Sequence, residues 1–291
     1  MRITGRTKLA GIMGWPVSHS RSPAVHNFWI DEHGIDGAYV PLTVRPEHLA
    51  QSLRALPVLG FRGCNLTQPH KQAALAIVDR VEPMARRIGA INTIIVAADG
   101  SLEGRNTDAF GFRENLRDRA PDWKASAGPA VVLGAGGGAR GVVAALIEAK
   151  VEEIRIVNRT LARAERLASD LMSPNTRIAV LPWNEREGAL RGCGLLVNTT
   201  SLGMGGEVEL EIDLQELPTS AVVADIVYVP LETPLLAATR QRGNRTVDGL
   251  GMLLHQGRPG FEAWFGSPVQ VTRELRAAVL TTLGGASSAT R

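Results

Sequence analysis

Apolar runs of strand length alternate along this 291-residue chain with longer stretches of helical period. The run 9–14 comes first, followed by a helical stretch over 22–33 and a second apolar run over 38–44. Further candidate strands share this short apolar character: Gly63 to Thr67, Ile91 to Val96, Ala130 to Leu133, Ile154 to Asn158, Leu195 to Asn198 and Val222 to Asp225. Strands that alternate with helices form α/β layers, in which the strands are mostly parallel and buried. The pattern therefore predicts an α/β protein.

Two domains are expected, because one domain usually takes roughly 100–200 residues. The polar segment 117–129 carries two prolines and marks a connection before a new βαβ unit, and we place the boundary slightly earlier, in the helix opened by Asp108. Two helical patterns near the end, 251–265 and 271–283, predict a chain that returns to its first domain. We expect one domain from 1–108 plus 250–291 and another from 109–249, with a cleft between them. The small, polar stretch 284–291 reads as a frayed tail.

Composition narrows the class of protein further. Hydrophobic residues make up 44% and charged residues 21%, which is ordinary for a globular protein. The net charge of +3 is spread along the chain, so no basic patch for nucleic acid is expected. No apolar run is long enough for a membrane span, and the six histidines lack metal-site spacing. Two lone cysteines, without paired spacing, fit a reducing cytoplasm.

A glycine-rich turn follows the strand 130–133 and opens an amphipathic helical stretch. Its residues are Gly134, Ala135, Gly136, Gly137, Gly138 and Ala139, a G-x-G-x-x-A pattern. In a strand–turn–helix context, the first glycine allows a tight turn, the second lets the backbone approach a pyrophosphate, and the alanine permits close helix packing. Exposed amide groups at the helix start bind the anion. The domain 109–249 is therefore predicted to be a Rossmann-like dinucleotide-binding domain.

The residues after the next strand indicate which dinucleotide binds. Asn158, Arg159 and Thr160 stand about 20 residues past the glycines, where the adenosine ribose is expected. An NAD site usually places a carboxylate there, whereas a guanidinium can pair bidentately with a 2′-phosphate. Arg159 therefore favours NADP (NADPH), with Arg163 as a second cation one helical turn on.

Four clusters of short polar side chains lie in the first half of the chain. They are Gly14 to Pro23, Asn65 to Lys71, Ala90 to Thr93 and Asn106 to Gly111. Each could by itself be a turn or a helix cap, since Ser, Thr, Asn and Asp are favoured there. Together they predict a ligand site, because strand ends in an open α/β sheet line its crevice.

These clusters, with the segments 198–204, 225–235 and 249–257, resemble the motifs of the shikimate dehydrogenase family in order and spacing across nearly the whole chain. The resemblance implies NADP-dependent reversible reduction of 3-dehydroshikimate to shikimate, in aromatic amino acid biosynthesis. It also implies a mixed α/β substrate-binding and catalytic domain beside the Rossmann-like domain. The family includes monomers and homodimers, so the oligomeric state stays open.

The resemblance also assigns roles to residues. Lys71 would be the acid/base, because an ammonium can stabilise the negative charge that develops on a ketone oxygen and supply the proton. Ser20 and Ser22 would bind the substrate carboxylate. Thr67, Asn92, Asp108 and Gln256 would bind ring hydroxyls or hold the catalytic pair Lys71 and Asp108, and Tyr228 would reach the substrate from the cofactor domain. Besides the glycine turn and Asn158, Arg159, Thr160 and Arg163, the cofactor residues would be Thr200, Ser201, Leu202, Gly203, Met204, Ile226, Gly249 and Met252.

Two alternatives stay open at this stage. One is a quinate/shikimate dehydrogenase that uses NAD. Ser22 favours shikimate, since quinate-preferring relatives tend to carry a larger hydroxyl residue at the second serine position. The other is a non-catalytic ligand sensor on the same fold, against which the presence of both Lys71 and Asp108 argues.

Overall fold

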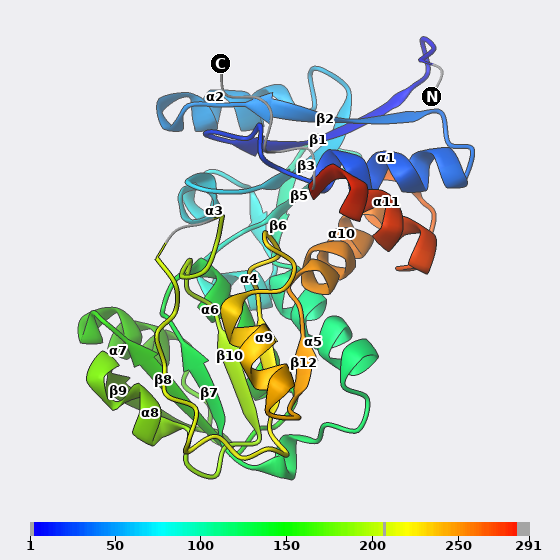
Figure 1. Ribbon diagram of the computed structural model, residues 1–291. Coiled ribbons are helices and arrows are strands. Elements are labelled where there is room, and N and C mark those ends of the chain that lie inside the picture. Colours follow the sequence, from blue (N-terminus) through cyan, green and yellow to red (C-terminus); the bar gives the residue numbers. More distant parts are fainter. Residues whose placement is uncertain (1–2, 206–207, 284–291) are drawn as a thin grey trace. The chain divides into compact units, whose positions relative to one another are not determined.

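The computed structural model describes residues 3–205 and 208–283, and it divides into two compact units (Figure 1). Unit 1 comprises Met1–Thr107 and Leu254–Arg291, and unit 2 comprises Asp108–Leu253. The predicted frayed tail, 284–291, lies outside the described residues. Among the helices of the described segments, none is both long and apolar enough to cross a membrane. The assignment of substrate to unit 1 and of the dinucleotide to unit 2 stays a prediction at this point.

Unit 1 contains a six-stranded sheet in the order β2-β1-β3-β5-β6-β4. The strands are β1 (Lys8–Gly14), β2 (Gly37–Thr43), β3 (Phe61–Leu66), β4 (Arg80–Val81), β5 (Thr93–Val96) and β6 (Leu102–Arg105). β2 and β3 both run parallel to β1, whereas β5 runs antiparallel to β3 and to β6. The expectation of parallel strands is therefore wrong for β5, because an apolar run indicates burial and not direction.

The antiparallel placement of β5 decides where the polar motifs meet. Its first residue, Thr93, pairs with Asn65 near the end of β3 and with Arg105 at the end of β6. At the end of β1, Met13 pairs with Leu66. The residues that follow β1, β3 and β6 and the residue that precedes β5 therefore gather at one end of this sheet.

Helices cover the sheet of unit 1, and their packing comes from apolar and aromatic side chains. They are α1 (Ser22–Glu32), α2 (Leu49–Ala55), α3 (His70–Ala73), α4 (Pro83–Ile88), α10 (Leu250–Phe265) and α11 (Arg273–Leu283), with short 3-10 turns at Pro46–His48 and Ala74–Ala76. Of α10, only the part from Leu254 onward belongs to unit 1. α1 packs on β2 and on α11. One core cluster joins Leu53, Leu66, Ile91 and Ile94 under α2 and α4, and burial of such side chains is the main source of stability.

Unit 2 contains a six-stranded, fully parallel sheet in the order β12-β11-β10-β7-β8-β9. The strands are β7 (Ala130–Leu133), β8 (Glu153–Asn158), β9 (Arg177–Pro182), β10 (Leu195–Asn198), β11 (Val222–Asp225) and β12 (Arg245–Val247). Numbered along this unit alone, the order is 3-2-1-4-5-6, which is that of a Rossmann fold. The strand order reverses between β7 and β10, which is where such sheets bind dinucleotides.

The helices of unit 2 are α5 (Asp108–Arg119), α6 (Gly137–Glu148), α7 (Leu161–Asp170), α8 (Arg186–Ala189) and α9 (Pro234–Gln241), with 3-10 turns at Ala125–Ala127 and Trp183–Glu185. α5 continues through 117–119, which the sequence assigned to a connection. Arg117 supports this last turn, because its guanidinium pairs with the Glu114 carboxylate three residues earlier at 2.6 Å. The predicted connection therefore begins only after Arg119.

Candidate functional site

Two serines stand where the chain leaves β1 and enters α1. Ser22 is the first residue of α1 and is buried, and its backbone N–H donates to Ser20 Oγ at 3.3 Å. Ser20 N–H in turn donates to the carbonyl of Val17 at 3.0 Å, which closes a tight turn. The Ser20 hydroxyl is therefore held against the backbone of Ser22, where the chain enters α1.

Asn92 is the centre of a buried hydrogen-bonded cluster at the same end. Its side-chain oxygen accepts from Thr107 N–H at 2.9 Å, and its side-chain N–H₂ donates to Thr107 Oγ1 at 3.0 Å and to Gln256 Oε1 at 3.3 Å. Gln256 comes from α10 and lies 164 residues beyond Asn92 in the chain. The structure thus brings together two of the predicted substrate residues, Asn92 and Gln256, around Thr107.

Thr67 and Lys71 lie on the loop and the short helix that follow β3. Thr67 N–H donates to the carbonyl of Met13 in β1, and the carbonyl of Lys71 accepts from Ile91 N–H at 2.7 Å. His70, directly before Lys71, is buried, and its Nε2 lies 2.8 Å from the carbonyl of Val44. These contacts anchor the backbone on both sides of Lys71, whose side chain is half-buried.

Asp108 opens α5 and is the first residue of unit 2. Its side chain is buried, and α6 passes close to it at Gly141. A β-carbon at Gly141 would lie 2.8 Å from the Cβ of Asp108, so the close approach requires glycine. The carboxylate at the start of α5 is also favourably placed for the helix dipole.

The glycine turn after β7 lies at the reversal of strand order in unit 2. Gly134 has a φ of +104° and sits so close to Thr199 Oγ1 that a β-carbon there would approach it to 2.8 Å. Gly136 caps α6, and open space surrounds both Gly136 and Gly137 on the side where a β-carbon would point. Ala139 is fully buried. The donor set, backbone N–H groups at a helix start beside open space, fits a pyrophosphate.

Arg159 and Arg163, the two cationic residues predicted to bind the cofactor, follow the end of β8. Asn158 Nδ2 donates to the carbonyl of Thr160 at 2.7 Å, which turns the chain into α7. Arg159 and Arg163 are exposed, and neither forms an ion pair with any residue in 3–205 or 208–283. Two exposed guanidiniums that follow β8, the strand beside β7, fit a second phosphate group in addition to the pyrophosphate.

The other predicted cofactor residues follow β10 and β11. Thr200 N–H and Oγ1 both donate to Asn198 Oδ1, and Thr200 Oγ1 accepts from Leu202 N–H, so the turn from Thr200 towards Met204 is internally hydrogen-bonded. The Ile226 side chain lies beside Gly138, and the backbone of Gly249 lies against the carbonyl of Ile226. Met252 is buried in α10 and Tyr228 is half-buried.

Comparison with known proteins decides the family. The model of the shikimate dehydrogenase substrate binding domain matches residues 12–94, and that of shikimate / quinate 5-dehydrogenase matches residues 117–203. A protein of Paramagnetospirillum magneticum named shikimate dehydrogenase (NADP(+)) is 60% identical over 96% of this chain and 100% of its own length. The chain belongs to the shikimate dehydrogenase family.

Solved structures of the family agree with this membership. Shikimate 5-dehydrogenase of Thermus thermophilus, in complex with NADP(H) and shikimate, is 36% identical with a TM-score of 0.83, over 94% of this chain and 99% of that one. Quinate dehydrogenase of Corynebacterium glutamicum, in complex with NAD, is 30% identical with a TM-score of 0.88, over 94% and 99%. This shikimate dehydrogenase family member therefore has the expected α/β fold, with a substrate-type domain and a Rossmann-like domain.

One buried carboxylate of this family member was not among the predicted site residues. Asp225 ends β11 and accepts from Asn198 Nδ2 on both oxygens at 3.1 Å, from Val227 N–H at 2.9 Å and from Thr233 Oγ1 at 2.8 Å. Through Asn198 it is linked to Thr200. Asp225 therefore holds together the two loops that carry predicted cofactor residues. Its position at the end of an apolar strand was the signal that could have found it.

The carboxyl of Asp225 predicts a pH dependence of stability. Burial raises its pKa from 3.8 to about 6, against the hydrogen bonds from Asn198, Val227 and Thr233, which lower it. The folded state binds a proton on the Asp225 carboxyl more tightly than the unfolded chain does. Protonated Asp225 therefore contributes to the free energy of unfolding; this contribution is fully present below about pH 4 and is lost as pH rises through 6. The pKa difference between the unfolded and the folded chain corresponds to a loss of about 3 kcal/mol in the free energy of unfolding by neutral pH.

We therefore expect the free energy of unfolding of the parent, relative to Asp225→Asn, to fall between pH 4 and pH 7. Urea denaturation of both proteins at several pH values measures this difference. Asp213→Asn, which removes an exposed carboxylate in the same unit, is the matched control and should give a curve parallel to the parent's. Parallel curves for Asp225→Asn as well would contradict the prediction.

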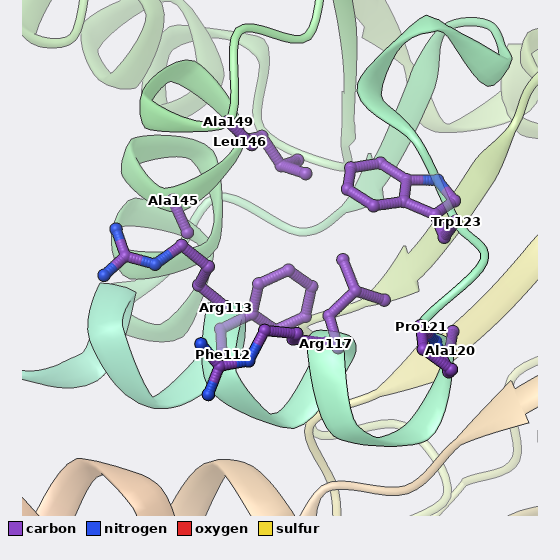
Figure 2. A pocket seen from close by; sticks show the side chains of 10 residues that line it. Phe112, Arg113, Arg117, Ala120, Pro121, Trp123, Ala145, Leu146 and Ala149 are labelled. Atoms are coloured by element: carbon purple, nitrogen blue, oxygen red, sulfur yellow. The ribbon is translucent and has the colours of Figure 1, made fainter.

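A separate apolar pocket of about 210 Å³ lies in unit 2 between α5, α6 and the turn after α5 (Figure 2). Phe112, Leu116, Trp123 and Leu146 line it. None of the predicted site residues of this family member is among its lining residues. The pocket is thus distinct from the strand ends that carry the candidate site.

Proposed function

We propose that this chain catalyses the reversible, NADP-dependent reduction of 3-dehydroshikimate to shikimate in aromatic amino acid biosynthesis. The observation that carries the proposal is the 60% identity, over 96% of the chain, to a protein named shikimate dehydrogenase (NADP(+)). The chain also carries Lys71 and Asp108 within the motifs that resemble those of the family.

Unit 2 would hold the cofactor. The backbone N–H groups from Gly136 to Ala139 would bind the pyrophosphate at the start of α6, and Arg159 and Arg163 would bind the 2′-phosphate. The turn 200–204, Ile226, Gly249 and Met252 would surround the remaining part of the cofactor. When bound, NADPH supplies the hydride for the ketone carbon.

Unit 1 would hold the substrate. Ser20 and Ser22 would bind its carboxylate, while Thr67, Asn92 and Gln256 would bind its ring hydroxyls, with Tyr228 contributed by unit 2. The cluster of Asn92 with Thr107 and Gln256 supports this role, because it presents fixed amide groups at the same end of the sheet as the serines.

Lys71, oriented by Asp108, would transfer the proton to and from the substrate oxygen. As the ketone is reduced, negative charge develops on its oxygen, and the Lys71 ammonium would stabilise that charge and donate a proton to the oxygen. Asp108 would orient Lys71 and accept a hydrogen bond from the adjacent hydroxyl. In the oxidation direction, neutral Lys71 would take the proton from the same hydroxyl.

A second candidate is an NAD-dependent oxidation of quinate, which the likeness to the quinate dehydrogenase of Corynebacterium glutamicum supports. Arg159 favours NADP over NAD, and Ser22 favours shikimate over quinate. A ligand sensor without turnover is the third and weakest candidate.

One assay separates these three candidates. The purified chain is mixed with shikimate or quinate and with NADP⁺ or NAD⁺, and the absorbance at 340 nm is followed in the four pairings. We expect the highest kcat/KM for shikimate with NADP⁺. A preference for quinate with NAD⁺ would favour the second candidate, and saturable shikimate binding without turnover would favour the sensor.

We also propose that the protein works in the cytoplasm on this small-molecule substrate. Cys64 and Cys193 are both buried free thiols, and burial raises the pKa of Cys193 to about 11. A buried thiol with a raised pKa is unreactive. Free thiols are typical of proteins in a reducing compartment such as the cytoplasm.

A further inference from the structure

Trp15 and Arg45 form a pair at the end of the unit 1 sheet where β1 and β2 finish. The Arg45 guanidinium lies over the Trp15 ring, 5.0 Å from the ring centroid. Trp15 directly follows β1, Arg45 stands two residues after β2, and the last residues of these strands, Gly14 and Thr43, pair with each other. Trp15 is 42% exposed, so the pair lies at the surface. The proposed reaction assigns no role to either residue.

Hydrogen bonds hold this pair beside the turn that leads to Lys71. Trp15 N–H donates to the carbonyl of Gln68 at 3.1 Å. The carbonyl of Val44, the residue before the arginine, lies 2.8 Å from His70 Nε2. Gln68 and His70 both stand within three residues of Lys71. The pair and the proposed acid/base therefore lie at the same end of the sheet.

The charge of Arg45 is not neutralised within the described segments. Arg45 is exposed and forms no ion pair there, and Glu47, the acidic residue closest to it in the chain, does not pair with it. In contrast, Arg105 at the end of β6 pairs with Glu103 at 2.6 Å. The Trp15 ring attracts the guanidinium through its negative face and leaves its net charge unchanged. A positive charge is therefore held in one place at this end of unit 1.

The substrate residues proposed for the carboxylate are neutral. Ser20 and Ser22 can donate hydrogen bonds through their hydroxyls, whereas the carboxylate carries a full negative charge. Lys71 is a cation, but its ammonium is assigned to the reacting oxygen. Arg21, between the two serines, has a buried Nε without a hydrogen-bond partner among the described residues, whereas Arg45 is held by an aromatic ring. Arg45 is thus the cation at this end whose position is fixed by a stacking contact.

We infer that Arg45, held by Trp15, is a recruiting residue for the anionic substrate: its positive charge attracts the substrate carboxylate to the end of the sheet that carries Ser20, Ser22 and Lys71. The inference rests on the proposed function, because it takes shikimate as the ligand. Arg45 takes no part in hydride or proton transfer. It raises the rate of encounter and the affinity, as a fixed charge does for an oppositely charged ligand.

Substitutions that change the charge at position 45 test this inference. With NADP⁺ at saturation and about 0.01 M salt, Arg45→Lys should keep kcat/KM for shikimate within about twofold of the parent. Arg45→Gln should lower it by about two- to fivefold, and Arg45→Glu by about the square of that factor, since a Coulomb energy is proportional to the charge. We expect kcat to stay within about twofold throughout. An order of kcat/KM that does not follow the charge would overturn the inference.

Salt distinguishes attraction at a distance from direct contact. The Debye length falls from about 30 Å at 0.01 M salt to about 3 Å at 1 M. The difference in kcat/KM between the parent and Arg45→Gln should therefore nearly vanish at 1 M salt. A local structural defect would persist there. A parent-to-variant ratio that is the same at both salt concentrations would contradict the role of Arg45.

A double-mutant cycle tests the part played by Trp15. Trp15→Leu removes the ring that holds the guanidinium but keeps the charge, so it should lower kcat/KM for shikimate by less than Arg45→Gln does. In the Arg45→Gln background, Trp15→Leu should lower kcat/KM no further. If the two effects multiply, Trp15 does not act through Arg45 and the inference is wrong for the pair.

Arg62→Gln is the matched control. Arg62 is an exposed arginine near the start of β3, about 13 Å along the strand from its end at Leu66. This variant lowers the net charge by the same amount and should leave kcat/KM for shikimate unchanged. Equal losses in Arg62→Gln and Arg45→Gln would show that only net charge matters, and would overturn the inference.

Calorimetry separates this inference from the proposed function. The dissociation constant for shikimate should follow the same charge series at position 45 and the same salt dependence. If the parent binds shikimate in the calorimeter but does not oxidise it, the proposed function fails, while the dissociation constants of the series still decide the role of Arg45.

Discussion

Replacing Lys71 by alanine will lower turnover by two to four decades while the affinity for NADP⁺ stays close to that of the parent. The reason is chemical: the alcohol proton has no acceptor without the lysine, and acid–base groups contribute about 10²–10⁴-fold. Lys71 lies in unit 1, and the predicted cofactor loops lie in unit 2, so the variant leaves those loops intact. Steady-state kinetics with shikimate and NADP⁺, together with NADPH binding by fluorescence, measure both quantities.

Lys124→Ala is the control for this experiment, since Lys124 is an exposed lysine outside every predicted site. Its kinetics should match those of the parent. If Lys71→Ala instead raises KM for shikimate and leaves turnover unchanged, Lys71 binds substrate and another group transfers the proton.

Replacing Arg159 by alanine will raise KM for NADP⁺ by about 10- to 100-fold, because a charge-assisted hydrogen bond to a phosphate is worth about 1.5–3 kcal/mol. KM for NAD⁺, which lacks the 2′-phosphate, should change less than about twofold. The exposed position of Arg159, without an ion-pair partner in the described segments, leaves its guanidinium available for this role.

Arg177→Ala serves as the control, because Arg177 is an exposed arginine of β9 in the same unit and pairs with Glu153 at 3.7 Å. It should affect neither cofactor. Equal increases in KM for NADP⁺ and NAD⁺ in Arg159→Ala would show that Arg159 does not bind the 2′-phosphate.

Four of the six strands in each unit could be predicted from the sequence, whereas β4 and β6 of unit 1 and β9 and β12 of unit 2 were missed. β7, β10 and β11 are buried on both faces, so each is a short apolar run with sharp ends. β6 has the sequence LEGR, in which only alternate positions are buried, and it could not be distinguished from a loop. The direction of β5 depends on its pairing with β3 and β6, which no local pattern contains.

The residues of the candidate site, too, could be predicted from the sequence only in part. Polar side chains at the ends of apolar runs could be found in the sequence, because strand ends form ligand sites in α/β folds. The buried hydrogen bond from the Tyr39 hydroxyl to Asn65 could not, since it depends on the stacking of Tyr39 on His26 and on the orientation of the Asn65 amide. Asp225 does have a signal in the sequence, since it ends an apolar run, but its role depends on the partners that two different loops bring to it.

A crystal structure of the chain with shikimate and NADP⁺ tests the proposed roles of Lys71 and Asp108. We expect Lys71 Nζ and the Asp108 carboxylate each to lie at hydrogen-bond distance, about 2.6–3.2 Å, from the reacting hydroxyl or its neighbour, with the nicotinamide facing the same ring carbon. We also expect the substrate carboxylate at Ser20 and Ser22. A complex in which the ring binds away from Lys71 and Asp108 would contradict both roles.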